Sequence, residues 1–258
     1  MTGYCSSAAL AVIFAFAAPL GASALSFDQN VTPDVIFGDG NANGGFTVDT
    51  ANGVEIGLRG KLRFDANDQP QNVFNSNGLG GYSFDAGNPP MGAGGAATPV
   101  WSFEWSINSN VDGSGGALDQ FTYLLELDGD PGAGTDFGSF DPINAPFFDH
   151  AIGDNTTGNG DGVAATSIGE YSALIAANNV AQNSWRYDFF NTTMTQLSAF
   201  DPNESGVYTI RLSAFDGQTA LASSSIDIRV GAVPLPATLP LLLAGIGGLA
   251  LLRRRRTA

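Results

Sequence analysis

The chain has 258 residues, 25 of them acidic and ten basic, and its formal net charge is −15. All 25 acidic residues lie between positions 25 and 231 with only six basic residues, so this stretch has a net charge of 6 − 25 = −19. Such a charge repels phosphate and anionic lipid, which excludes nucleic acid as a partner and favours solubility and cation binding. A well-solvated acidic surface without a dedicated partner is the simpler interpretation.

The first 24 residues have the composition of a secretory signal peptide. Residues 8–20 form an apolar run of suitable length, and the small residues Ala22 and Ala24 precede an expected cleavage before Leu25. The segment before the run contains no Lys or Arg, which departs from the usual pattern. The single cysteine, Cys5, lies in that segment, so we expect no disulfide in the exported protein.

Alternation of apolar and polar residues predicts strands between positions 25 and 231. Segments rich in Gly, Asn, Asp and Pro separate five runs of period two, at 54–64, 101–107, 121–127, 208–214 and 226–230. The last two runs flank Asp216 and Gly217, which predicts a hairpin. One-sided alternation indicates one buried and one solvent-exposed face. We therefore expect a single all-β domain, an antiparallel β-sandwich of jelly-roll or Ig-like type.

Two further features complete this prediction for the domain. Residues 168–178 form the only plausible helix, because their Ala, Leu and Glu content favours one. Trp101, Trp105 and Trp185 all fall within strand patterns. We therefore expect the three tryptophans in the core rather than on a sugar-binding surface.

Acidic, glycine-rich turns provide the candidate metal site. Asp128, Asp130 and Asp136 follow a predicted strand, and a second acidic segment, 154–161, lies in the long loop 149–162. Carboxylate and carbonyl oxygens on flexible turns suit calcium, although the spacing does not match an EF-hand loop. Calcium is thus the one candidate cofactor, and a solvent-exposed Asp-Gly turn is the alternative.

The sequence predicts no catalytic residue. His150 is the only histidine, which excludes zinc or catalytic sites built from several histidines. The many carboxylates are compatible with a glycoside hydrolase pair, but their spacing singles out no two of them. Arg59, Lys61 and Arg63 share one side of a predicted strand. They either bind an acidic polysaccharide or form the solvent-exposed face of an edge strand.

The last 26 residues combine a short motif, an apolar span and a basic end. Residues 235–252 are almost all apolar and would extend about 27 Å as a helix, enough to cross a bilayer core. The basic end would stay in the cytoplasm by the positive-inside rule, which leaves residues 25–231 outside it. A buried core helix is the alternative. The basic end consists of Arg253, Arg254, Arg255 and Arg256.

This tail resembles the VPLPA form of the PEP-CTERM sorting signal. The motif consists of Val233, Pro234, Leu235, Pro236 and Ala237. The resemblance implies an exported protein of a Gram-negative envelope, whose partner is an exosortase, a membrane-embedded cysteine transpeptidase. It also implies cleavage near the motif and transfer to the cell surface or the extracellular matrix. The resemblance covers the tail alone and implies no activity for the preceding residues.

These patterns divide the chain into a signal peptide (1–24), a β-sandwich ectodomain (25–231) and a sorting tail (232–258). We expect a single-pass inner-membrane precursor that becomes a cell-surface or extracellular protein with a structural or adhesive role and no enzymatic activity. Two alternatives stay open. One is a calcium-dependent polysaccharide-binding module, and the other is a carboxylate-based glycoside hydrolase.

Overall fold

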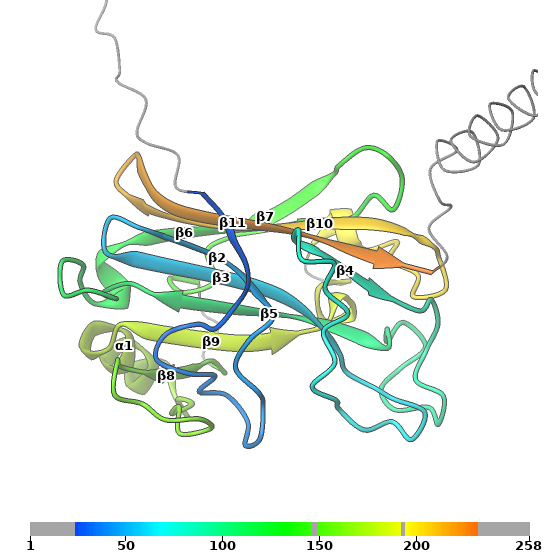
Figure 1. The fold of residues 1–258 in the computed structure, drawn as a ribbon, viewed down its shortest axis with the longest axis horizontal. Coiled ribbons are helices and arrows are strands. Elements are labelled where there is room, and N and C mark those ends of the chain that lie inside the picture. Colours follow the sequence, from blue (N-terminus) through cyan, green and yellow to red (C-terminus); the bar gives the residue numbers. More distant parts are fainter. Residues whose placement is uncertain (1–23, 146–148, 192–193, 232–258) are drawn as a thin grey trace, which may run out of the picture.

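The computed structural model describes residues 24–145, 149–191 and 194–231 (Figure 1). These residues form two packed sheets of six and five strands, which confirms the predicted all-β sandwich. The choice between a jelly-roll and an Ig-like topology stays a prediction. In the described ranges, no helix is long and apolar enough to span a membrane. The expected span 235–252, the sorting motif, the four terminal arginines and residues 1–23 lie outside those ranges.

Sheet A has the strand order β1-β2-β3-β5-β9-β8, and each of its neighbouring pairs is antiparallel. Two of these strands, β3 and β5, were predicted from alternation, and they lie at the centre of the sheet. The shorter or more polar strands around them were not predicted. The strands are β1 (Ser26–Gln29), β2 (Phe46–Ala51), β3 (Val54–Leu62), β5 (Trp101–Asn108), β8 (Ala151–Gly153) and β9 (Val180–Trp185).

Sheet B has the order β4-β11-β10-β6-β7, and β10 and β11 form the predicted hairpin around Asp216 and Gly217. The pair β4–β11 is parallel, so this sheet is mixed, whereas the sequence predicted a purely antiparallel sandwich. Parallel pairing requires a long crossover connection, which alternation within single strands does not reveal. The strands are β4 (Gly81–Phe84), β6 (Thr122–Asp128), β7 (Phe137–Phe140), β10 (Gly206–Asp216) and β11 (Thr219–Val230).

Helical structure is sparse in the described residues. The α-helix α1 (Ile168–Ala177) lies where the sequence predicted one, and Ser167 caps its N-terminus by accepting a hydrogen bond from the Glu170 N–H. Three short 3-10 helices complete the fold: η1 (Leu118–Gln120), η2 (Tyr187–Phe190) and η3 (Thr195–Leu197).

An aromatic core fills the space between the two sheets. Trp101 and Trp105 are fully buried and Trp185 is 4% exposed, which confirms their predicted place in the core. The Trp101 ring lies 5.1 Å from that of Tyr187 and 6.2 Å from that of Tyr208, measured between centroids. Burial of such large side chains supplies most of the stabilisation, at about 25 cal/mol per Å² of apolar surface.

The outer face of sheet A is covered, although alternation predicted a solvent-exposed face. The 30–45 segment between β1 and β2 crosses this face, as the blue trace in front of the strands shows (Figure 1). Its apolar side chains Val31, Val35 and Ile36 are buried. Gly57 in β3 leaves room for Val31, because a Cβ atom at this glycine would lie 2.6 Å from Val31 Cγ1.

Polar side chains of sheet A hold the 30–45 segment in place. The Gln182 side chain accepts a hydrogen bond from the Ile36 N–H at 2.8 Å and donates to the Asp34 carbonyl at 2.7 Å. The Glu55 carboxylate accepts from the Thr32 N–H at 2.7 Å. Backbone groups of an irregular buried segment need such partners. This requirement explains why the outward positions of sheet A are polar and yet buried.

Candidate functional site

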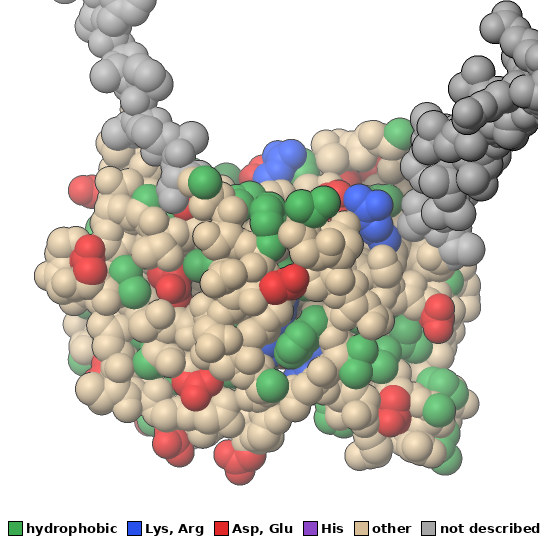
Figure 2. All heavy atoms as spheres, viewed as in Figure 1, with side chains coloured by type: hydrophobic (Ala, Val, Ile, Leu, Met, Phe, Trp, Pro, Cys, Tyr) green, Lys and Arg blue, Asp and Glu red, His purple; other side chains and the backbone are tan. Residues whose placement is uncertain are grey.

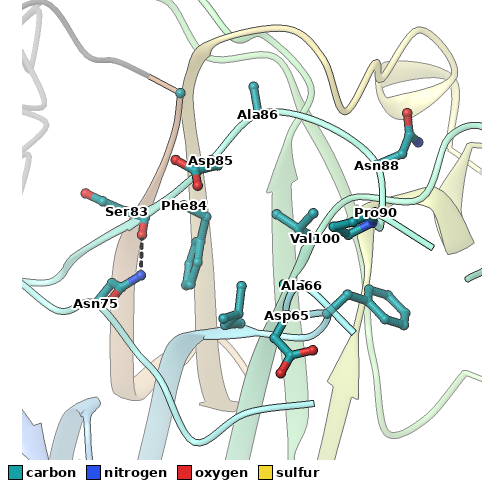
Figure 3. Close-up of a pocket in the computed structure, with 13 residues that line it drawn as sticks. Asp65, Ala66, Asn75, Ser83, Phe84, Asp85, Ala86, Asn88, Pro90 and Val100 are labelled. Carbon is teal, nitrogen blue, oxygen red and sulfur yellow. Dashed lines mark hydrogen bonds between the residues drawn. The ribbon is translucent and has the colours of Figure 1, made fainter. Parts of the chain in front are cut away.

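A cleft of about 600 Å³ opens at one end of the sandwich (Figure 3). It lies where β3, β4 and β11 end and where β5 begins, so both sheets contribute to it. Apolar side chains from three of these places, Leu62, Phe84 and Val100, line its inner part. Figure 3 shows Phe84 and Val100 pointing into the cleft. The volume is within the range of small-ligand pockets.

The core holds Phe84 in position. The Phe84 ring stacks on Trp101 with a centroid distance of 6.4 Å and an interplanar angle of 17°. Gly60 in β3 leaves room for the Phe84 ring, because a Cβ atom at Gly60 would lie 2.9 Å from an atom of that ring. The apolar floor of the cleft is therefore built on the rigid centre of the sandwich.

Asp65 provides a carboxylate at the rim of the cleft. Its oxygens accept hydrogen bonds from the Asn67 and Gln69 N–H groups at 2.8 and 3.0 Å, and from the Gln71 side chain at 2.9 Å. The bonds from Gln69 and Asn67, in this order of effect, lower the pKa of Asp65 from its ordinary value. Asp65 is therefore held in its ionised form.

Asp85 and Asn75 offer free acceptors to a ligand. The exposed Asp85 carboxylate has no hydrogen-bond partner among the described residues, and it lies close to Phe84 in Figure 3. Asn75 donates to the Ser83 carbonyl at 2.9 Å, and its Oδ1 atom accepts from no described residue. None of the described residues that line the cleft is Lys or Arg. The cleft thus combines an apolar floor with hydrogen-bond acceptors.

The predicted basic stripe lies elsewhere and is largely buried. Arg59 is fully buried and Lys61 is 2% exposed, under the 30–45 segment on the outer face of sheet A. Their strand, β3, has neighbours on both sides and is not an edge strand. The two interpretations from sequence, a polysaccharide contact and a solvent-exposed edge, are therefore wrong for these two residues. Arg63 follows β3 and is half-buried.

Glu104 in the neighbouring strand β5 balances these buried cations. Its Oε2 atom lies 2.6 Å from Arg59 Nε and 2.5 Å from Arg59 Nη2, and its Oε1 atom lies 3.4 Å from Lys61 Nζ. Burial lowers the pKa of both cations, and the charge of Glu104 opposes this effect. Glu104 was not among the residues predicted from the sequence to have a role. The strand pattern placed it on the same side as Ser102 and Ser106, and the cross-strand register pairs it with Arg59.

The Arg59 guanidinium also fastens the 30–45 segment to the sheet. Its Nη1 atom donates to the Ala42 carbonyl at 2.9 Å and to the Gly44 carbonyl at 2.5 Å. The rings of Phe46 and Phe74 each lie 4.1 Å from the guanidinium carbon. These contacts give the buried cluster a structural role, since no solute can reach it without displacing the segment.

Two of the three acidic residues predicted to bind metal, Asp128 and Asp130, accept hydrogen bonds from the backbone in this structure. Asp128 is buried, and its Oδ1 atom accepts from the N–H groups of Asp130 and Asp136 at 3.0 and 2.8 Å. Asp130 in turn accepts from the Gly132 N–H at 2.8 Å. Within residues 24–145, 149–191 and 194–231, no three His, Cys, Asp or Glu side chains are grouped so that they could hold a metal ion. The predicted calcium site is thus not preassembled there.

The second acidic segment, 154–161, belongs to the other sheet. Residues 149–162 were predicted as one long loop, but residues 151–153 of it form the edge strand β8 of sheet A. The acidic segment follows this strand. Asn159 donates to the carbonyls of Val35 and Asn41 at 3.0 and 2.7 Å, so the loop packs on the 30–45 segment. The carboxylate of Asp154 accepts from the Thr156 N–H at 2.8 Å.

His150 is buried in an aromatic environment. Its Nε2 atom lies 2.7 Å from the Pro142 carbonyl and its Nδ1 atom 3.2 Å from Asn183 Nδ2, which together define a neutral ring that is protonated on Nε2. The ring of Trp105 packs edge-on at 5.0 Å. Burial lowers the pKa of His150, and neither nitrogen faces the cleft residues. This arrangement is structural rather than catalytic.

The chain was compared with models of protein families, with curated proteins and with solved structures, and none of them matches it. The site is therefore assigned from its geometry alone. The cleft was not predicted from the sequence, because most of its residues lie in the turn-rich segments between β3 and β5. The length of the connection between those two strands was the available signal, since long loops in compact domains often carry function.

Proposed function

We propose that this chain is an exported protein that serves a non-enzymatic, adhesive or structural role at the cell surface or in the extracellular matrix. One observation supports this most. The first strand of the sandwich, β1, begins at Ser26 and the last, β11, ends at Val230, so all of its strands fall within the limits of 25–231 that the flanking export and sorting patterns predict for an ectodomain. A dense acidic sandwich without disulfides suits such a role, because its stability rests on its core and its solubility on its charge.

In this proposal the tail directs sorting. Residues 235–252 span the inner membrane and Arg253 to Arg256 stay in the cytoplasm. An exosortase-type transpeptidase then acts at the motif from Val233 to Ala237. Since β11 ends at Val230, only a few residues separate the sandwich from this motif.

Reporter fusions test this topology. A reporter that is active only in the cytoplasm, inserted after Gly231, is expected to be inactive, because the sandwich and its end lie outside. The matched control places the same reporter after Arg256, where activity is expected. Activity of the first fusion would overturn the export proposal.

Intact-mass measurement of the protein from the envelope and from the medium tests processing. The expected masses lack residues 1–24, and the released form ends near the motif between Val233 and Ala237. Recovery of only the uncleaved 26.6 kDa chain in both fractions would contradict sorting by a transpeptidase.

A carboxylate-based hydrolase is the second candidate, because Asp65 and Asp85 line the same cleft. A glycosidase needs one carboxyl group with a raised pKa as general acid. Hydrogen bonds lower the pKa of Asp65, so this arrangement favours binding over hydrolysis. Incubation with oligosaccharides is expected to yield no shorter products. Products that disappear in both Asp65→Asn and Asp85→Asn would instead establish the hydrolase.

A further inference from the structure

The cleft at the end of the sandwich presents two surfaces that match those of a sugar ring. Its floor is apolar, formed by Leu62, Phe84 and Val100, and a sugar ring has a face of C–H groups. Its rim carries oxygen acceptors, and the edge of a sugar carries hydroxyl donors. Pockets of this size, with few polar groups around an apolar floor, are typical of small-ligand sites.

From this match we propose that the cleft binds a short stretch of an uncharged or amino-substituted saccharide. The inference rests on the proposed function, because it needs residues 25–231 to be outside the cytoplasm where such glycans are met. The cleft is open, so a longer glycan can continue from it into solvent.

Charge defines the class of saccharide. Asp85 is exposed and unpaired among the described residues, and Asp65 is held in its ionised form. No described cation lines the cleft. A uronic acid or sulfated sugar would therefore meet two negative charges without compensation, whereas a hydroxyl or an ammonium group is attracted to them.

The hydrogen-bonding groups favour a saccharide over a peptide. Most of the free side-chain groups of the cleft are acceptors: the Asp85 carboxylate and Asn75 Oδ1 only accept hydrogen bonds, and the Ser83 hydroxyl can both accept and donate. The Asn88 amide already donates to the carbonyls of Ala96 and Thr98, at 2.8 and 3.0 Å. A peptide backbone also brings carbonyl groups that need donors. Sugar hydroxyls donate to acceptors and take their remaining bonds from water.

Isothermal titration calorimetry on the full-length chain tests the proposal, in a zwitterionic detergent that has no sugar headgroup. The probes are neutral gluco-, manno- and galacto-oligosaccharides, a glucosamine trimer and a galacturonate trimer. We expect at least one neutral or amino-sugar probe to bind and the galacturonate trimer not to bind. Peptide binding is assayed with a proline-rich decapeptide, which we expect to show no heat of binding.

Matched substitutions locate the site. Ala66 lines the cleft at an exposed position, so Ala66→Trp blocks it without disturbing the core and weakens binding at least about tenfold. Ala164→Trp, at an exposed position outside the cleft, leaves binding unchanged. Asp85→Asn weakens binding of the amino-sugar probe, whereas Asp216→Asn, at the β10–β11 hairpin, has no effect.

Several results would overturn the inference: no probe binds, the galacturonate trimer or the peptide binds most tightly, or Ala66→Trp binds as well as the unchanged chain. These results concern the purified chain in solution. They are therefore distinguishable from failure of the export proposal, which the reporter fusions alone decide.

Discussion

Glu104 determines whether two buried cations are tolerated under the 30–45 segment. Arg59 and Lys61 together carry two positive charges, and Glu104 is the one acidic side chain within salt-bridge distance of them among the described residues. The carbonyl groups of Ala42 and Gly44 accept hydrogen bonds from Arg59, and Asn41 Oδ1 accepts one from Lys61 Nζ. A buried cluster of this kind contributes little net stability, but removal of one partner is costly because it leaves the others unpaired.

We predict that Glu104→Gln lowers the free energy of unfolding by about 3–5 kcal/mol, because two buried cations lose their counter-charge. Urea denaturation followed by tryptophan fluorescence measures this loss. Glu204→Gln is the control, since Glu204 is exposed, and its effect should stay within about 0.5 kcal/mol. Equal effects of the two substitutions would show that the cluster does not matter for stability.

His150 makes stability depend on pH. Burial lowers its folded-state pKa from 6.5, while the Pro142 carbonyl and the carboxylate of Asp149 oppose this shift. Below about pH 6.5 the unfolded chain takes up a proton that the folded chain refuses. The contribution of His150 is therefore fully present above this pH and is lost as pH falls toward the folded-state pKa.

We predict that His150→Gln removes this dependence, because glutamine keeps a donor for Pro142 and has no titration. The free energy of unfolding is measured at several pH values below and above 6.5. At each pH, the value for the variant is subtracted from the value for the unchanged chain. Burial raises the pKa of Glu55, which gives stability the opposite dependence on pH. Glu55 is present in both chains, so the subtraction removes its contribution. A difference that does not change with pH would contradict the assignment.

At the scale of elements, the 30–45 segment determines that sheet A is buried on its outer face as well as on its inner face. It covers the outer face, so β3 and β5 are buried on both sides, and every residue of β5 is buried. Gly57 allows this close contact, whereas a side chain at that position would collide with Val31. The segment and the sheet are therefore one packing unit and not a core with a loose loop.

We predict that Gly57→Ala costs about 1–3 kcal/mol, the usual cost of overpacking, and exposes the 30–45 segment to proteases. Thermal unfolding and limited proteolysis measure these effects. The control, Gly169→Ala, lies in α1 with no atom within 4 Å of the added Cβ, and it should stabilise the chain by up to about 1 kcal/mol. If Gly57→Ala is neutral, the segment adapts more freely than its contacts indicate.

At the scale of the whole molecule, no three acidic side chains of the described residues are gathered as a metal site would need. Figure 2 shows separate acidic side chains over the visible face and basic atoms in only a few places. Calcium binding needs six to eight oxygens around one point. Two of the predicted ligands, Asp128 and Asp130, instead accept hydrogen bonds from backbone N–H groups of their own loop, and the N–H group of Asp136 donates to Asp128.

We therefore predict that EDTA or added calcium leaves the melting midpoint of the chain unchanged. Asp128→Ala should lower the free energy of unfolding by about 1–3 kcal/mol in either condition, because the partly buried N–H groups of Asp130 and Asp136 lose their acceptor. A midpoint that rises with calcium in the unchanged chain and not in Asp128→Ala would restore the metal site.

The alternation in residues 54–64, 101–107 and 208–214 predicted β3, β5 and β10, because facing inward or outward is a local property of a strand. The short strands β4 and β8 had no such signal, since only pairing with distant partners makes them strands. The cleft could not be predicted from the sequence for the same reason, because it depends on contacts between distant segments. Its residues come from positions as far apart as Leu62 and Gly231.

The sequence by itself determined the fold class, the acidic charge, the main strands and the expectation of export, because composition and periodicity are written in neighbouring residues. Only the tertiary structure decided that the outward face of sheet A is dry, that Arg59 and Lys61 are paired with Glu104, and that an open cleft lies beside Gly231. Burial depends on what packs against a face, and alternation along one strand cannot specify a covering segment that comes from elsewhere in the chain.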